Sequence, residues 1–273
     1  MNNTSIPWPT QREIRESMSF SAIVDINGIS NPKTGGFHVA QDAVDAGHKS
    51  IFVRDGTYPG VAINKNNVSL VGENKAGVVF DGGTASEGLY VSGDNCTVQN
   101  VCCRTTAGGG SAYDAVYLTG TNRCRLMDIH IDQADDYGMY LTSPTNSYLQ
   151  IARVYITGCD NCGIYFHDAA SATLIDSFIF SNGGNGLNGN SPYVRVSGCS
   201  VYSNTAEGIA FNLGNADNSV IHGNVVVSNG TYGILIGTND ENCVISANRV
   251  GANSTADITD NSGTSTSTGN DVT

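Results

Sequence analysis

A tyrosine recurs at a nearly constant step through the middle of the chain, in the segments GLYVSG, AVYLTG, GMYLTS and GIYFHD. The four residues are Tyr90, Tyr117, Tyr140 and Tyr165. On stacked parallel strands, side chains at equal register form one continuous row. Sugar rings bind aromatic faces through their C–H surfaces, so the row predicts a platform for binding a glycan. The alternative is that the rings stack on one another only to stabilise the sheet.

Ionisable residues near these segments supply candidate catalytic groups. A polysaccharide lyase or epimerase needs a base for a sugar proton and a cation for the neighbouring carboxylate. The candidates are Asp128, His130, Arg153, Tyr155 and His167. A hydrolase would instead use two carboxylates, for which Asp128, Asp132, Asp135, Asp136 and Asp160 are available. The alternative is that these charged residues are ordinary solvent-exposed surface residues without a catalytic role.

The eight cysteines do not indicate a metal centre. Cys159 and Cys162 form a CxxC motif, but no second pair or histidine follows at ligand spacing. The surrounding sequence is typical of a turn, whereas a redox motif opens a helix. We therefore expect buried free thiols, no metal site and no cofactor.

The elements that must position these residues are short strands in a repeat. Aligning the small residue that opens each strand gives a period in the low twenties, which is typical of a solenoid. The aligned positions are Gly88, Ala115, Gly138, Gly163, Gly186, Gly208, Gly233 and Asp257. A leucine-rich consensus is missing. The sequence thus predicts an all-β fold, a right-handed single-stranded parallel β-helix whose coils lie roughly 4.8 Å apart.

Alternation assigns the faces of the strands. After each aligned residue the first and third side chains point inward and the second points outward, so Asn188, Ala210 and Leu235 continue the tyrosine row outward. Two asparagine series are expected at the turns. The first is Asn182, Asn204, Asn229 and Asn253. The second is Asn95, Asn122, Asn146, Asn218 and Asn242, followed by the small residues Cys96, Ser147, Ser219 and Cys243, with Cys124 nearby.

One outward face is unusually apolar. Phe178, Phe180, Tyr202, Val225 and Val227 flank inward residues on three successive strands. A contiguous exposed apolar patch indicates a protein interface, and we expect self-association through this face. Cover by a loop or by the N-terminal arm is the alternative.

The ends of the chain differ from the repeat. We expect residues 1–22 to be a docking arm. Residues 23–87 would hold a capping helix, roughly Phe37 to Ala46, and the first coils. Regular coils would follow over 88–256, and 257–273 would be a polar tail or a last coil.

The segment that begins KSIFVRDGTYPG resembles the start of the pectin lyase-like β-helix superfamily, where a short helix leads into such strands. The resemblance covers most of the chain and implies the right-handed parallel β-helix fold. That fold hosts lyases, hydrolases, esterases, epimerases and phage tailspikes, so it does not fix an activity. The opening is also similar to that of pectin methylesterases, and GIYFHD is loosely similar to a motif of mannuronan epimerases.

The net charge and the terminal sequence limit the kinds of partner that the protein can be expected to bind. The net charge of −12 disfavours nucleic acid, and no apolar run is long enough for membrane insertion. The first residues lack a secretory signal pattern. The leading hypothesis is a tailspike-like or tail-fibre-like virion protein, a homotrimer as in tailspikes of this fold, that is released by cell lysis. It would dock on other virion proteins through residues 1–22 and bind a bacterial surface polysaccharide, with or without cleaving it. The alternative functions are a polysaccharide lyase or uronate epimerase, and a capsid decoration protein. The alternative location is the cytoplasm.

Overall fold

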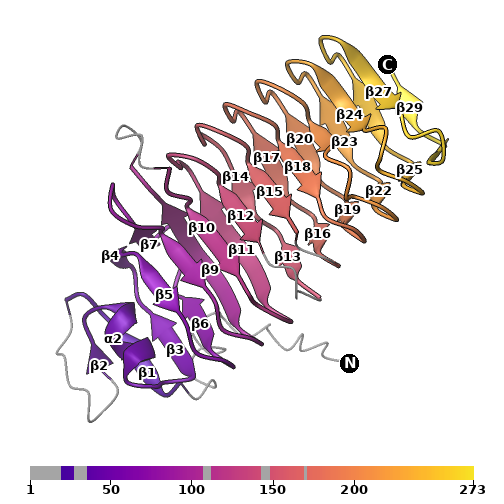
Figure 1. The fold of residues 1–273 in the computed structure, drawn as a ribbon. Helices are drawn as coiled ribbons and strands as arrows, with labels where there is room; N and C mark the ends of the chain where they lie inside the picture. Colours follow the sequence, from indigo (N-terminus) through magenta and orange to yellow (C-terminus); the bar gives the residue numbers. More distant parts are fainter. Residues whose placement is uncertain (1–19, 28–35, 107–111, 143–147, 169–170) are drawn as a thin grey trace, which may run out of the picture.

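In the computed structural model, which describes residues 20–27, 36–106, 112–142, 148–168 and 171–273, the chain winds into a stack of β-coils. Figure 1 shows the coils following one another along a rod, from the N-terminal end to the C-terminal end. All strand pairs are parallel among the described residues, and the strands fall into three rows. A mostly β solenoid of about nine coils is therefore confirmed.

The first row contains β2 (Gly36–Phe37), β1 (Ala22–Val24), β3 (Ser50–Val53), β6 (Ser69–Gly72), β9 (Thr97–Arg104), β11 (Arg125–Ile131), β13 (Gln150–Ala152), β16 (Thr173–Ile175), β19 (Arg195–Ser197), β22 (Val220–His222), β25 (Val244–Ser246) and β28 (Thr266–Thr268). The second row contains β4 (Gly56–Pro59), β7 (Val78–Asp81), the later halves of β9 and β11, β14 (Tyr155–Ile156), β17 (Phe178–Phe180), β20 (Ser200–Tyr202), β23 (Val225–Val227), β26 (Arg249–Gly251) and β29 (Asp271–Val272). Because β9 and β11 run through both rows, these two rows form one 20-stranded sheet.

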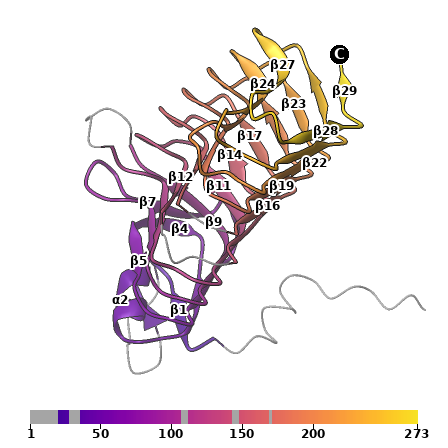
Figure 2. The ribbon, with the colours of Figure 1, turned by 45° about the vertical axis from the view of Figure 1, so that its right-hand side comes forward.

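The third row is a separate nine-stranded sheet. Its strands are β5 (Val61–Ile63), β8 (Leu89–Val91), β10 (Val116–Thr119), β12 (Met139–Thr142), β15 (Ile164–His167), β18 (Leu187–Asn190), β21 (Ile209–Phe211), β24 (Tyr232–Ile236) and β27 (Ala256–Asp260). Figure 2 shows the coils from another side, each lying behind the next.

The predicted register of the third row is confirmed. Leu89 pairs with Val116, Val116 with Met139, and the same step continues to Ile258. Glycine is favoured before most of these strands because side chains of the next coil, and the carbonyl of its own glycine, occupy the space that a Cβ atom would need. A Cβ atom on Gly208 would lie 2.5 Å from Val226 Cγ1 and 2.7 Å from Asn229 Nδ2.

The inward residues form one continuous core, as expected from alternation. Ala210 and Leu235 differ from the prediction, because their exposed fractions are only 0% and 9% although they lie on the outward side. They are register neighbours, and the short side chain of Ala210 lies between those of Asn188 and Leu235. Alternation along a strand predicts the direction in which a side chain points. It does not predict whether longer neighbouring side chains shield it from solvent.

The first asparagine series forms the predicted ladder. The Nδ2 of Asn182 donates to Asn204 Oδ1 (2.9 Å), that of Asn204 to Asn229 Oδ1 (3.0 Å), and that of Asn229 to Asn253 Oδ1 (3.1 Å). Asp257 ends the ladder by accepting a hydrogen bond from Asn253 Nδ2 at 2.9 Å. The ladder satisfies polar groups at a corner that is closed to water.

A further ladder was missed in the sequence. Asn224 Nδ2 donates to Asn248 Oδ1, and Asn248 Nδ2 donates to Asn270 Oδ1, both at 3.0 Å. The signal was present, since an asparagine precedes the second-row strand in these three coils.

The second predicted asparagine series is correct in part. Asn95, Asn218 and Asn242 adopt positive φ angles of 54°, 57° and 55°, and the small residues after them are buried. Asn122 does not belong to the series, because Arg123 takes the left-handed position there with φ of 56°. Asn146 and Ser147 lie outside the described residues.

The predicted helix over 37–46 is too long. The observed helix, α2 (Ala40–Asp45), has six residues, and Phe37 belongs to β2. Ala40, Ala43 and Val44 are buried, but such a short helix covers little of the end coil. Within the described part of the chain, no helix has the length and apolar character needed to cross a membrane. Most of the expected N-terminal arm lies outside the described residues.

All eight cysteines are buried free thiols, as the sequence predicts. Burial is the main cause that raises the pKa of Cys162 to about 11, so this thiol stays protonated at neutral pH.

Candidate functional site

The tyrosine row, defined as Tyr90, Tyr117, Tyr140 and Tyr165, lies on the outward side of the nine-stranded sheet. Its successive ring centroids are 5.5, 5.4 and 5.5 Å apart, and the Tyr117 and Tyr140 rings are stacked at an interplanar angle of 16°. The rings are half-buried, so each keeps one part open to solvent. The row forms a continuous aromatic surface along four coils.

Tyr137 extends this surface and was missed in the sequence. Its ring stacks on Tyr140 with centroids 5.2 Å apart, and it lies 5.3 Å from Tyr165. Burial is the main cause that raises its pKa to about 12, with help from the neighbouring Asp136. Tyr137 immediately precedes Gly138, and Tyr232 holds the equivalent position before Gly233, but the residue type at this position otherwise changes from coil to coil.

Asp114 occupies the equivalent position one coil earlier. Its exposed fraction is 7%, and its Oδ1 accepts a hydrogen bond from the Tyr137 amide at 3.1 Å. Burial, followed by the charges of Asp136 and Glu87, raises its pKa to about 8. A buried carboxyl with a strongly raised pKa beside an aromatic surface is a common feature of functional sites. The sequence alone offered no reason to single it out.

His167 lies at the other edge of the tyrosine row. Its ring centroid is 5.3 Å from that of Tyr165 and 5.7 Å from that of Tyr140. Its Nδ1 lies 3.6 Å from Asp168 Oδ2, just beyond hydrogen-bond distance. The structure therefore brings one predicted catalytic candidate next to the predicted binding residues.

The other four catalytic candidates lie in the 20-stranded sheet or at its corner. Arg153 makes a two-pronged ion pair with Asp128, with both N–O distances at 2.8 Å. The His130 ring meets Tyr155 edge-on at 5.0 Å, and burial lowers the pKa of His130. The structure does not bring these residues together with His167, because strands in different sheets carry them.

The predicted interface residues are neighbours on the second row. Phe178 pairs with Ser200 and then Val225, while Phe180 pairs with Tyr202 and then Val227. The Phe180 and Tyr202 rings are stacked 4.8 Å apart at 4°, and Tyr155 meets Phe180 edge-on at 4.9 Å. We call Tyr155, Phe178, Phe180, Tyr202, Val225 and Val227 the apolar strip. It ends in the register neighbour Arg249.

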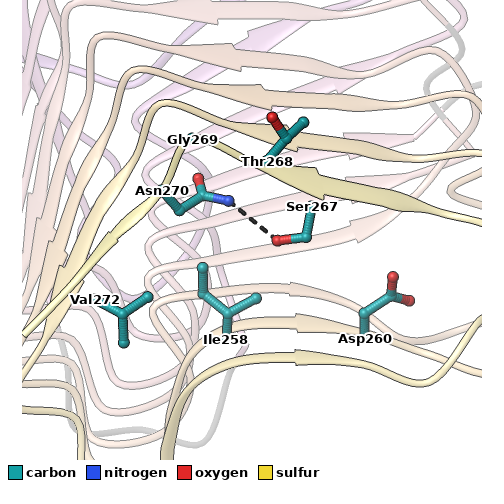
Figure 3. Close-up of a pocket in the computed structure, with 7 residues that line it drawn as sticks. All are labelled: Ile258, Asp260, Ser267, Thr268, Gly269, Asn270 and Val272. Carbon is teal, nitrogen blue, oxygen red and sulfur yellow. Dashed lines mark hydrogen bonds between the residues drawn. The ribbon is translucent and has the colours of Figure 1, made fainter.

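Two concave regions lie away from the tyrosine row. One, of about 390 Å³, opens at the C-terminal coil between Ile258 and Val272 (Figure 3). There the Nδ2 of Asn270 donates to Ser267 Oγ at 3.0 Å, and the second asparagine ladder ends. The other, of about 470 Å³, follows the small residues of the turns at Gly158, Ser181 and Ser203. Neither region gathers ionisable groups with perturbed pKa values as the tyrosine row does.

The fold places the chain in a structural class, that of the right-handed parallel β-helices found in pectate lyases, alginate epimerases and phage tailspikes. No protein-family model matches the sequence, and no curated protein does.

Among solved structures, the chain is similar to the enzymatically active domain of tailspike protein 2 from bacteriophage CBA120, with a TM-score of 0.67 and 15% identity over 85% of this chain and 40% of that one. It is also similar to an alginate lyase from Paenibacillus sp. (TM-score 0.57, 15% identity, 85% and 91% of the two chains). The A-module of a mannuronan C-5 epimerase from Azotobacter vinelandii gives a TM-score of 0.54 and 14% identity over 91% and 72%. At such identities the likeness shows the fold alone.

Proposed function

We propose that the protein binds a bacterial surface polysaccharide along the tyrosine row, as a tailspike-like or tail-fibre-like component of a virion. The observation that carries the proposal is the continuous aromatic surface of Tyr90, Tyr117, Tyr140 and Tyr165, which Tyr137 widens. A repeated aromatic spacing suits a repeating ligand, because consecutive sugars can contact consecutive rings. Asp114 and His167 at its edges supply hydrogen-bonding groups.

Replacing Tyr140 with alanine tests the binding surface. Tyr140 contacts three other tyrosine rings, so its loss interrupts the row at the centre. We expect affinity for a polysaccharide ligand, found by screening capsular and O-antigen preparations, to fall at least about tenfold. Tyr193→Ala is the control, because Tyr193 is an exposed tyrosine at a turn outside the row. Equal affinity of both variants for the ligand would contradict the proposal.

The apolar strip supports the further proposal that three copies associate side by side. Phe178 and Val225 keep exposed fractions of 50% and 38%, and their neighbours make the patch continuous along the rod. Exposed apolar surface of this kind is stabilised when a partner covers it. A second-row interface leaves the tyrosine row, in the other sheet, available for ligand.

Val225→Asp should dissociate the trimer, since a carboxylate buried in an apolar interface costs several kcal/mol. Light scattering should give three times 28.5 kDa for the wild type and 28.5 kDa for the variant. Val244→Asp is a matched control, because Val244 is a strand valine with an exposed fraction of 37% in the first row. A variant that keeps the wild-type mass of a trimer, or a wild type that is monomeric, would show that the apolar strip is not the interface.

Cleavage of the polysaccharide is the second candidate function. It is favoured by the contact of His167 with Tyr140 and Tyr165, which offers a base at the edge of the binding surface. Lyase activity would yield unsaturated ends, hydrolysis would yield reducing ends, and epimerisation would change the sugar without shortening the chain. A protein that only decorates the capsid needs no polysaccharide ligand. The affinity measurement described for Tyr140→Ala therefore distinguishes this alternative, because it would then detect no Tyr140-dependent binding.

A further inference from the structure

The outward side of the third row is built from three parallel columns of side chains. The tyrosine row is the middle column. On one flank lie the residues that precede the small aligned positions, namely Glu87, Asp114 and Tyr137. On the other flank, Thr119, Thr142 and His167 are register neighbours on β10, β12 and β15. A ligand on the tyrosines is therefore bordered by carboxyl groups on one side and by hydroxyls and an imidazole on the other.

The charges around this surface have one sign. Asp136 and Glu87 both act electrostatically on Asp114, and Asp168 follows His167. None of the nine described strands of the third row carries a lysine or an arginine. Among the described residues, three arginines are paired with carboxylates: Arg104 with Asp81 and Arg153 with Asp128 at 2.8 Å, and Arg54 with Asp25 at 3.4 Å. The backbone of Arg104 lies beside Gly88, but its guanidinium is bound to Asp81.

A polyuronate places one negative charge on every sugar. Proteins that bind such a chain neutralise it with arginine, lysine or a metal ion. Here the ligand carboxylates would instead approach Glu87 and Asp136, whose negative charges repel them.

From this arrangement we infer that the tyrosine row takes an uncharged stretch of polysaccharide, whose hydroxyl groups hydrogen-bond Asp114 and the threonine flank. The inference rests on the proposed function and names its ligand class. A preference for an uncharged ligand also argues against the alternative that the protein is an enzyme acting on uronates.

Asp114 fits an uncharged ligand for a second reason. Its pKa of about 8 keeps the carboxyl protonated at neutral pH, so it can donate a hydrogen bond as well as accept one. The groups that act on it are Glu87, Asp136 and the amide of Tyr137, and it acts electrostatically on Tyr117, Tyr140 and Cys159. None of these is a cation that would draw a ligand carboxylate to it.

The test compares uronate-containing bacterial polysaccharides before and after chemical reduction of their carboxyl groups to alcohols. The two forms share one backbone and differ in charge. Calorimetry on the full chain at low salt should show the reduced form binding about tenfold more tightly, and the gap should narrow in ~1 M NaCl. Glu87→Gln should raise affinity for the charged form and leave the reduced form unchanged. Tyr140→Ala should weaken both.

The outcomes separate the inference from the function on which it rests. Charged forms that bind as tightly as their reduced forms, with or without added Ca²⁺, would overturn the inference and leave the binding surface standing. If neither form of any polysaccharide binds in a Tyr140-dependent way, the proposed function falls and the inference falls with it.

Discussion

Asp114→Asn should make the protein more stable at pH 8 and above, and should flatten the dependence of its stability on pH. In the folded state the pKa of Asp114 is about 8, and the main cause is burial. In the unfolded chain an aspartate titrates near ~3.9. An asparagine side chain keeps an oxygen that can accept the hydrogen bond from the Tyr137 amide.

The sign follows from proton uptake. Between the two pKa values the folded state holds a proton that the unfolded state has lost, so the free energy of unfolding decreases as pH rises from about 4 to about 8. Four pKa units correspond to roughly 5 kcal/mol, which is the expected order of the wild-type loss from this group.

Urea unfolding of wild type and variant across this range measures the effect. Asp271→Asn is the control, because Asp271 is exposed on the last strand and its replacement should leave the wild-type slope unchanged. Parallel stability curves for wild type and Asp114→Asn would show that the carboxyl of Asp114 is ionised at neutral pH.

Asn204→Ala should lower the free energy of unfolding by roughly 3–6 kcal/mol. Asn204 is 2% exposed, and its side chain donates to Ile179 O and Asn229 Oδ1 while accepting from the backbone and the side chain of Asn182. Asn229 Oδ1 keeps the hydrogen bond from the backbone amide of residue 204. The amide and side chain of Asn182 lose their acceptor and Ile179 O loses this donor, and each such loss costs about 1–3 kcal/mol.

Asn239→Ala supplies the matched comparison, since Asn239 is an exposed asparagine in a turn. Urea unfolding should separate the two variants clearly, with the control within about 0.5 kcal/mol of wild type. A small loss for Asn204→Ala would mean that water replaces the ladder, and that the corner is open to solvent in solution.

The sequence predicts the fold well because each coil of a solenoid needs similar residue types at equivalent positions. A glycine recurs at the position of Gly208 in most coils because the next coil leaves little room for a Cβ atom, although Ala115 and Asp257 occupy this position in two coils. An asparagine recurs at the position of Asn204 because its neighbours in the ladder need the same groups. Repetition turns a weak local signal into a strong one. The length of α2 was overestimated because it occurs once, and the pattern from Phe37 fits a strand end as well as a helix start.

The candidate site was predictable only where it follows the repeat. The four tyrosines share one register, so their alignment could be inferred from spacing. Asp114 and Tyr137 occupy a position whose residue type changes from coil to coil, and their importance comes from burial. His130 and Arg153 were grouped with His167 because spacing along the chain does not reveal which of two sheets a strand joins.

The contact between Gly208 and the following coil has a consequence for how such a chain can change over generations. The side chains that require this glycine, Val226 and Asn229, both belong to the adjacent coil, and Gly186 meets Val201 and Asn204 in the same way. A gene that loses or duplicates one complete coil thus keeps every glycine beside a suitable neighbour. The rod can grow or shrink by whole coils without redesign of its interior. If the proposed function holds, the length of polysaccharide that the tyrosine row spans changes with it.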